Sequence, residues 1–130
     1  MSVIIRTPSD SNVHTQFCNA RLSWNRTFGP QRTDLFRKTQ EYVDISVLRH
    51  CDPLVPMRTG VLKRSGVLGT IIGSGDVRYI APYAKKQYYE NRGTGQRGKM
   101  WFERMKAQHL DGILAGAASI AKAEKARAKS

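Results

Sequence analysis

The feature that most constrains the fold is an amphipathic stretch at residues 33–51, which ends where Asp52 precedes Pro53. Thr33 can cap a helix here, and Asp34 would stand in its first turn. Apolar and aromatic residues then recur at helical spacing, namely Leu35, Phe36, Tyr42, Val43, Val47 and Leu48. A residue before proline avoids helical backbone angles, so we expect the helix to stop at Asp52.

The first 32 residues favour β-structure. Between Cys18 and Asn25, apolar and polar residues alternate with the period of two that a half-buried strand requires. Gly29 and Pro30 predict a loop that closes this segment. Further along, residues 67–72 and 77–80 are predicted to be the strands of a hairpin, joined by a tight turn at residues 73–76.

Three helical segments complete the expected fold. Thr59 can cap a short helical turn that runs to Ser65, and Pro82 suits the start of a helix at residues 83–90. The last helix is expected from Trp101, with Met105, Ile113, Leu114 and Ile120 as further anchors, and its basic tail at 121–130 is expected to fray or dock on a partner. We predict a single α+β domain over residues 1–130. Its small antiparallel sheet, made of the N-terminal strands and the hairpin near 67–80, packs against the helix at 33–51 and the C-terminal helix.

Length and charge exclude several classes of protein. The chain has 130 residues, of which 40% are hydrophobic, enough for one buried core without metals or disulfides. No uncharged stretch approaches the roughly 20 residues that cross a bilayer, and the N-terminus lacks the pattern of a signal peptide, so we expect a soluble intracellular or assembled protein.

The formal net charge is +12, most of it in the second half of the chain. Such a surplus favours contact with a polyanion or an acidic partner, although a solvated basic face is the simpler alternative.

Catalytic and metal-binding patterns are weak. Two cysteines and three histidines lie scattered with no zinc-binding spacing, so no metal is expected. Residues 93–99 read GTGQRGK, which partly fits a phosphate-binding loop, but Met100 stands where Ser or Thr would bind magnesium, and no apolar strand precedes the loop. His50 and Cys51 are adjacent on a helix and do not face each other. We therefore expect no enzymatic activity and no cofactor.

The basic segment at residues 85–106 is the candidate binding site. It holds seven Lys and Arg residues against two Glu, interleaved with aromatic residues. Basic groups beside aromatics suit contact with phosphates, and the alternative is a solvated charged rim around aromatic core anchors. The glycine-rich loop at 93–98 is also typical of a flexible tip that reaches a neighbouring subunit.

Three blocks within residues 55–108 make the sequence resemble a known family. Residues 55–66 read VPMRTGVLKRSG, residues 79–90 read YIAPYAKKQYYE, and residues 99–108 read KMWFERMKAQ. In order and spacing they resemble the VPM-x-TG-x-L-x-x-S, PYA-x-x-QYY and WFE-x-x-K elements of the phage minor capsid protein family. That family is related to the neck, or head–tail connector, proteins of long-tailed phages.

The resemblance implies a non-enzymatic structural virion protein of the phage neck, acting in tail completion. It would form a homo-oligomeric ring between the DNA-filled head and the tail, beside portal-side and tail proteins, after synthesis in the host cytoplasm. Contact with the DNA channel or an acidic partner is expected from Lys85, Lys86, Arg92, Arg97 and Lys99. The expected subunit-interface or fold anchors are Thr59, Gly60, Leu62, Tyr83, Tyr88, Tyr89, Trp101 and Phe102. The alternative function is a free basic nucleic-acid-binding module.

Overall fold

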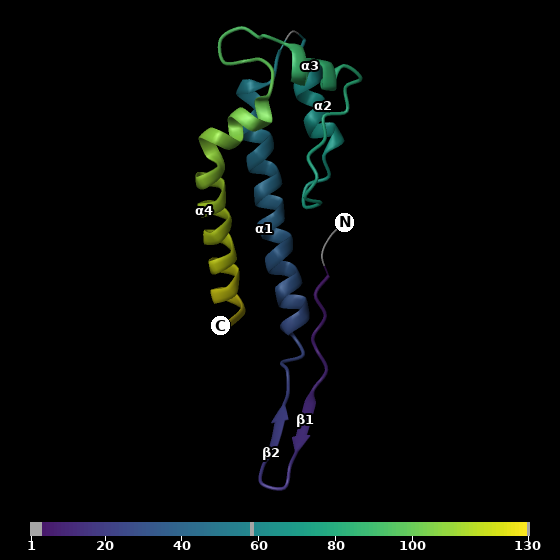
Figure 1. The fold of residues 1–130 in the computed structure, drawn as a ribbon, viewed down its shortest axis with the longest axis vertical. Helices are drawn as coiled ribbons and strands as arrows, with labels where there is room; N and C mark the ends of the chain where they lie inside the picture. Colours follow the sequence, from purple (N-terminus) through teal and green to yellow (C-terminus); the bar gives the residue numbers. More distant parts are fainter. Residues whose placement is uncertain (1–3, 58, 130) are drawn as a thin grey trace.

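The computed structural model describes residues 4–57 and 59–129. Its elements are β1 (Ser11–His14), β2 (Asn19–Leu22), α1 (Phe28–Cys51), the 3-10 helix η1 (Asp52–Leu54), α2 (Val61–Gly69), α3 (Ala84–Glu90) and α4 (Trp101–Lys129). Figure 1 shows an elongated molecule in which α1 and α4 lie side by side along the long axis. The helices α2 and α3 lie where α1 ends, and β1 and β2 extend beyond its start. The predicted α+β class is confirmed.

The long helix α1 begins five residues earlier than predicted and ends at Cys51, as expected. Gly29 and Pro30 lie in its first turn rather than in a loop, because a proline there removes only an N–H that has no partner within the helix. Thr33 is consequently not the cap. Its hydroxyl accepts a hydrogen bond from the Ile5 N–H at 2.9 Å and fixes the N-terminal segment against the helix.

The predicted N-terminal strand is confirmed as β2, but the sheet does not pack against the helices. β2 pairs antiparallel with β1, which lies in the same β-favouring N-terminal segment. All eight strand residues are exposed, and the ribbon projects away from the helices (Figure 1). That part of the predicted architecture is wrong.

The predicted hairpin at residues 67–80 is also wrong. Residues 67–69 belong to α2, and residues 70–72 and 77–80 form no strand in the described part of the chain. The turn between them is real, and the Ser74 N–H donates to the Ile71 carbonyl at 3.0 Å. One side chain replaces the expected ladder: the Thr70 hydroxyl accepts from the Arg78 N–H at 3.0 Å.

A buried carboxylate on α1 holds this turn in place. Asp44 is 2% exposed, and its Oδ2 accepts hydrogen bonds from the N–H groups of Gly73 at 2.8 Å and Gly75 at 3.1 Å. Its Oδ1 accepts from Gln40 Nε2 at 2.9 Å. Both glycines have positive φ angles, which most side chains resist, so both N–H groups can face one acid. The 70–80 segment is thereby fixed to the middle of α1.

The core lies where the end of α1 meets η1, α2, α3 and the start of α4. Its buried members include Cys51, Leu54, Val55, Leu62, Ala81, Ala84, Trp101, Met105 and Ile113. Gly60 has a positive φ of 82° and starts α2 without a side-chain cap, so Thr59 is not the cap that the sequence suggested. Leu114, an expected anchor, is exposed.

The helix α4 packs along α1 beyond this core. Gly116 lies against the ring of Tyr42, and a larger residue there would clash with it. Residues 121–129 are helical rather than frayed, and Glu124 forms an ion pair with Lys38 of α1 at 3.0 Å. The two longest helices therefore support each other along most of their length.

Replacing Asp44→Asn should destabilise the fold by about 1–3 kcal/mol, because an amide puts N–H groups where a carboxylate oxygen now accepts hydrogen bonds. Urea unfolding followed by circular dichroism measures the change. Asp34→Asn is the matched control on the same helix, since its ion pair with Arg37 is exposed and such pairs contribute about 0–1 kcal/mol. Equal stability of the two variants would contradict the role assigned to Asp44.

Stability should also fall in mild acid through His50. Its ring stacks on that of His109 of α4, with 4.2 Å between centroids, and burial, followed by the charges of His109 and Arg49, lowers the pKa of His50 below 6.5. The folded state therefore binds this proton less readily than the unfolded state. The stabilising contribution of neutral His50 is complete above about pH 6.5 and is lost as the pH falls through the pKa of His50 in the folded state. His50→Gln should flatten the dependence of the urea midpoint on pH. An unchanged dependence would show that other titratable groups cause the loss of stability in mild acid.

Candidate functional site

The glycine-rich loop at residues 93–98 is fixed to the body of the protein. Thr94 and Arg97 form a bridge through two backbone hydrogen bonds of 2.9 and 3.2 Å. The Gly98 N–H donates to the Leu54 carbonyl of η1 at 3.0 Å, and the Lys99 N–H donates to the Asn91 carbonyl at 2.7 Å. These N–H groups are committed to carbonyl oxygens, so they are not arranged to cradle a phosphate.

Two arginines anchor the loop from its sides. Arg97 Nη1 donates to the carbonyl oxygens of Asp52 at 2.9 Å and Val55 at 2.8 Å. Arg104, in the first turn of α4, donates through Nη1 to the Gln96 carbonyl at 2.7 Å and through Nε to the Lys99 carbonyl at 3.0 Å. Arg97 thus gives a charged donor to two carbonyl groups of the segment that follows α1. Sequence reasoning did not single out Arg104.

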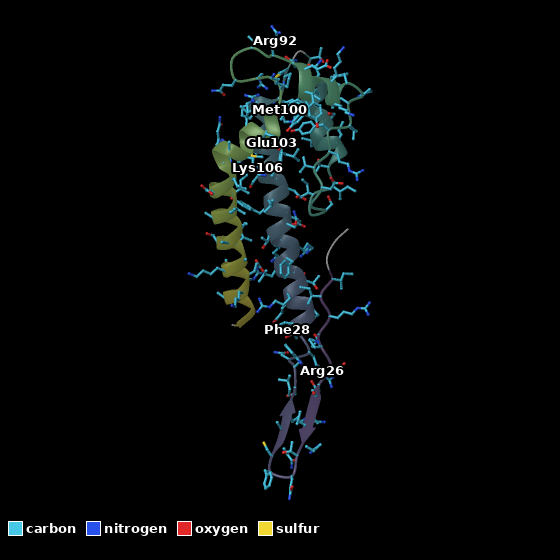
Figure 2. All side chains as sticks on the ribbon, in the orientation of Figure 1. Arg26, Phe28, Arg92, Met100, Glu103 and Lys106 are labelled. Atoms are coloured by element: carbon cyan, nitrogen blue, oxygen red, sulfur yellow. The ribbon has the colours of Figure 1, made fainter. Side chains whose placement is uncertain are left out.

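The other predicted contact residues lie exposed at the same end of the molecule. Lys85 and Lys86 stand on α3, and Arg92 and Lys99 flank the glycine-rich loop. Figure 2 shows Arg92 at the tip of this end and Lys106 beyond it along α4. We call Lys85, Lys86, Arg92 and Lys99 the basic end. Arg97 differs from these four because its guanidinium is partly buried against η1.

The predicted anchors divide into buried and exposed groups. Trp101 and Leu62 are buried, and Tyr88 packs edge-on against Trp101 with 4.7 Å between centroids. The exposed members are Thr59, Tyr83, Tyr89 and Phe102. The first group supports the fold, and the second is free to meet another molecule.

An apolar groove of about 560 Å³ opens beside the basic end. Cys51, Tyr79 and Trp101 form its inner wall, and the exposed Lys85 and Tyr89 stand at its mouth. Burial raises the pKa of the Cys51 thiol to about 11, so the thiol is protonated near neutral pH and is a poor nucleophile. The groove is suited to an apolar side chain rather than to thiol chemistry.

Within the described residues, no group of three or more His, Cys, Asp and Glu side chains is placed to hold a metal ion. No helix in the same part of the chain is both long and apolar enough to cross a membrane. No family model matches the chain, and searches of curated proteins and of solved structures found no match.

Arg97→Ala should destabilise the protein by about 1–3 kcal/mol, because it leaves two partly buried carbonyl groups without their charged donor. Lys99→Ala, two residues away and exposed, should change stability by no more than about 0.5 kcal/mol. Urea unfolding of both variants tests this difference. Equal stabilities would show that Arg97 is as free as its neighbours to contact a partner.

Proposed function

We propose that this chain is a non-enzymatic structural subunit of the phage neck, a minor capsid or tail-completion protein. In this function, copies join into a ring that connects the DNA-filled head to the tail. The observation that carries the assembly part of the proposal is the accessible surface, which is larger than that of a compact monomer of this mass. The phage neck itself comes from the resemblance of residues 55–108 to the minor capsid family.

The accessible surface area is 9735 Å². A compact monomer of 14.6 kDa exposes about 6,900 Å², so this chain exposes about 2,800 Å² more. Interfaces of standard size bury about 800 Å² on each partner. The excess is enough for two such interfaces on every subunit, which is what a subunit with neighbours on both sides needs.

The exposed surface also carries many large hydrophobic side chains. Among the described residues, exposed large hydrophobic side chains outnumber the buried hydrophobic residues of the core. They include Phe17 in the loop between β1 and β2, Leu68 in α2 and Ile71 just after α2. Large hydrophobic side chains that lie together on an exposed surface are typical of interaction sites.

The basic end gives the proposed ring a role beside DNA. Its four exposed cations contact phosphates without reading sequence, and each contact weakens as salt rises. An acidic surface on a neighbouring ring would satisfy the same charges. The same four residues support the second candidate function, a free nucleic-acid-binding module, which would use them as its whole binding site.

Mass spectrometry of purified phage particles should detect this chain in a fixed small ratio to the portal, consistent with one ring per particle. A copy number in the hundreds would instead assign it to the capsid shell or the tail tube. Absence from particles would contradict the proposal. In that case, DNA binding that weakens steeply with salt and is lost in Lys85→Ala and Lys86→Ala would favour the nucleic-acid-binding module.

A further inference from the structure

We propose that the β1–β2 arm of one subunit docks, through its apolar face, on an apolar strip of the next copy of the same chain. The strip consists of Val67, Leu68, Ile71, Ile72 and Ile80. This inference rests on the proposed ring function and names the contact that would join its subunits.

The arm has one apolar and one polar face. Residues opposite each other in an antiparallel pair point to the same side, and successive residues alternate. The register pairs Val13 with Ala20 and Ser11 with Leu22, which places three apolar side chains on one face. The other face carries Asn12, His14, Asn19 and Arg21. Such a pattern is expected of a ribbon that covers an apolar surface on one side only.

No part of the described chain covers this apolar face. Val13 and Leu22 are 54% and 55% exposed, and Phe17 at the tip of the arm is 91% exposed. The arm points away from the helices, beyond the start of α1 (Figures 1 and 2). Two-stranded ribbons are marginally stable in water by themselves, so contact with a partner would stabilise the arm.

The strip lies near the other end of α1 and is equally uncovered. Leu68 and Ile71 are each 78% exposed, and Val67 and Ile80 are also exposed. Thr70 and Arg78 join the two halves of the strip by a hydrogen bond, and Asp44 fixes the turn between them. The strip is therefore a fixed apolar surface on the body of the protein.

The placement of the two patches favours a second copy as the occupant. The arm and the strip lie apart along the long axis, so the arm of one chain points away from its own strip (Figure 1). A contact between two unlike patches is heterologous, and its repetition closes into a ring or continues as a filament. The excess surface of one chain, about 2,800 Å², is also large enough for two interfaces of standard size, which bury about 800 Å² on each partner.

Two variants that each destroy one patch test this arrangement. Leu22→Asp places a charge on the apolar face of the arm, and Leu68→Glu places one in the strip. Asn19→Asp adds the same charge to β2 on its polar face and is the matched control. Sedimentation velocity measures assembly, native mass spectrometry identifies the species, and circular dichroism should show unchanged helix content.

We expect the unaltered chain and Asn19→Asp to form oligomers. Each of the other two variants alone should require at least tenfold higher concentration to assemble. An equimolar mixture of Leu22→Asp and Leu68→Glu should form a dimer with one copy of each, because the first retains its strip and the second retains its arm. A contact between two identical patches predicts no such rescue.

Three results would overturn the inference. The first is an unaltered chain that stays monomeric up to about 100 μM, well above the μM dissociation constants that interfaces of standard size reach. The second is assembly of Leu22→Asp equal to that of Asn19→Asp, and the third is a mixture of Leu22→Asp and Leu68→Glu that gives no heterodimer. None of them bears on the neck assignment, because the ratio of this chain to the portal in particles is measured separately. Conversely, solution oligomers of a chain that is absent from particles would retain the arm contact and reject the neck function.

Discussion

The buried carboxylate of Asp44 determines where the most apolar part of the surface lies. It binds two backbone N–H groups of the 73–75 turn and so fixes the 70–80 segment against α1. The flanks of the segment are held separately, by the hydrogen bond between Thr70 and Arg78 and by Tyr79, whose ring packs against Trp101 with 5.4 Å between centroids. A charge-assisted hydrogen bond in a low-dielectric site is stronger than one in water, so a single carboxylate can hold the turn between these flanks. The strip that we propose for docking is presented by this interaction.

Local patterns predicted the parts of the fold that depend on local physics. The end of α1 before Pro53 and the start of α4 at Trp101 follow from backbone sterics and apolar spacing, and both were predicted correctly. The hairpin at 67–80 was wrong because a run of β-branched residues does not specify a pairing partner. Residues 67–69 continue a helix, and the Thr70 hydroxyl occupies the Arg78 N–H that a ladder would use.

The candidate site was predictable only in composition. The sequence identified the basic segment, but it could not show which cations are free, since that depends on carbonyl groups brought close by the fold. Arg97 and Arg104 are held by carbonyls of η1 and of the glycine-rich loop, whereas Lys85 and Lys86 remain exposed. Asp44 had one sequence signal: it shares a helix face with Val47 and Cys51, where an acid needs a hydrogen-bonding partner.

Charge and apolar surface make opposite demands on such a subunit. Copies that each carry +12 repel one another, so contacts between them must come from apolar burial, and added salt should strengthen them by screening. The proposed contact with DNA would weaken under the same change, because it would depend on released counterions. The two surfaces are also separate in the fold, with the cations on α3 and beside the glycine-rich loop and the apolar residues on the arm and near α2.

A small core, in which two of the buried side chains are alanines, gives the single chain modest stability. The proposed assembly would stabilise the fold by mass action and would couple the folding of this chain to the presence of its neighbours.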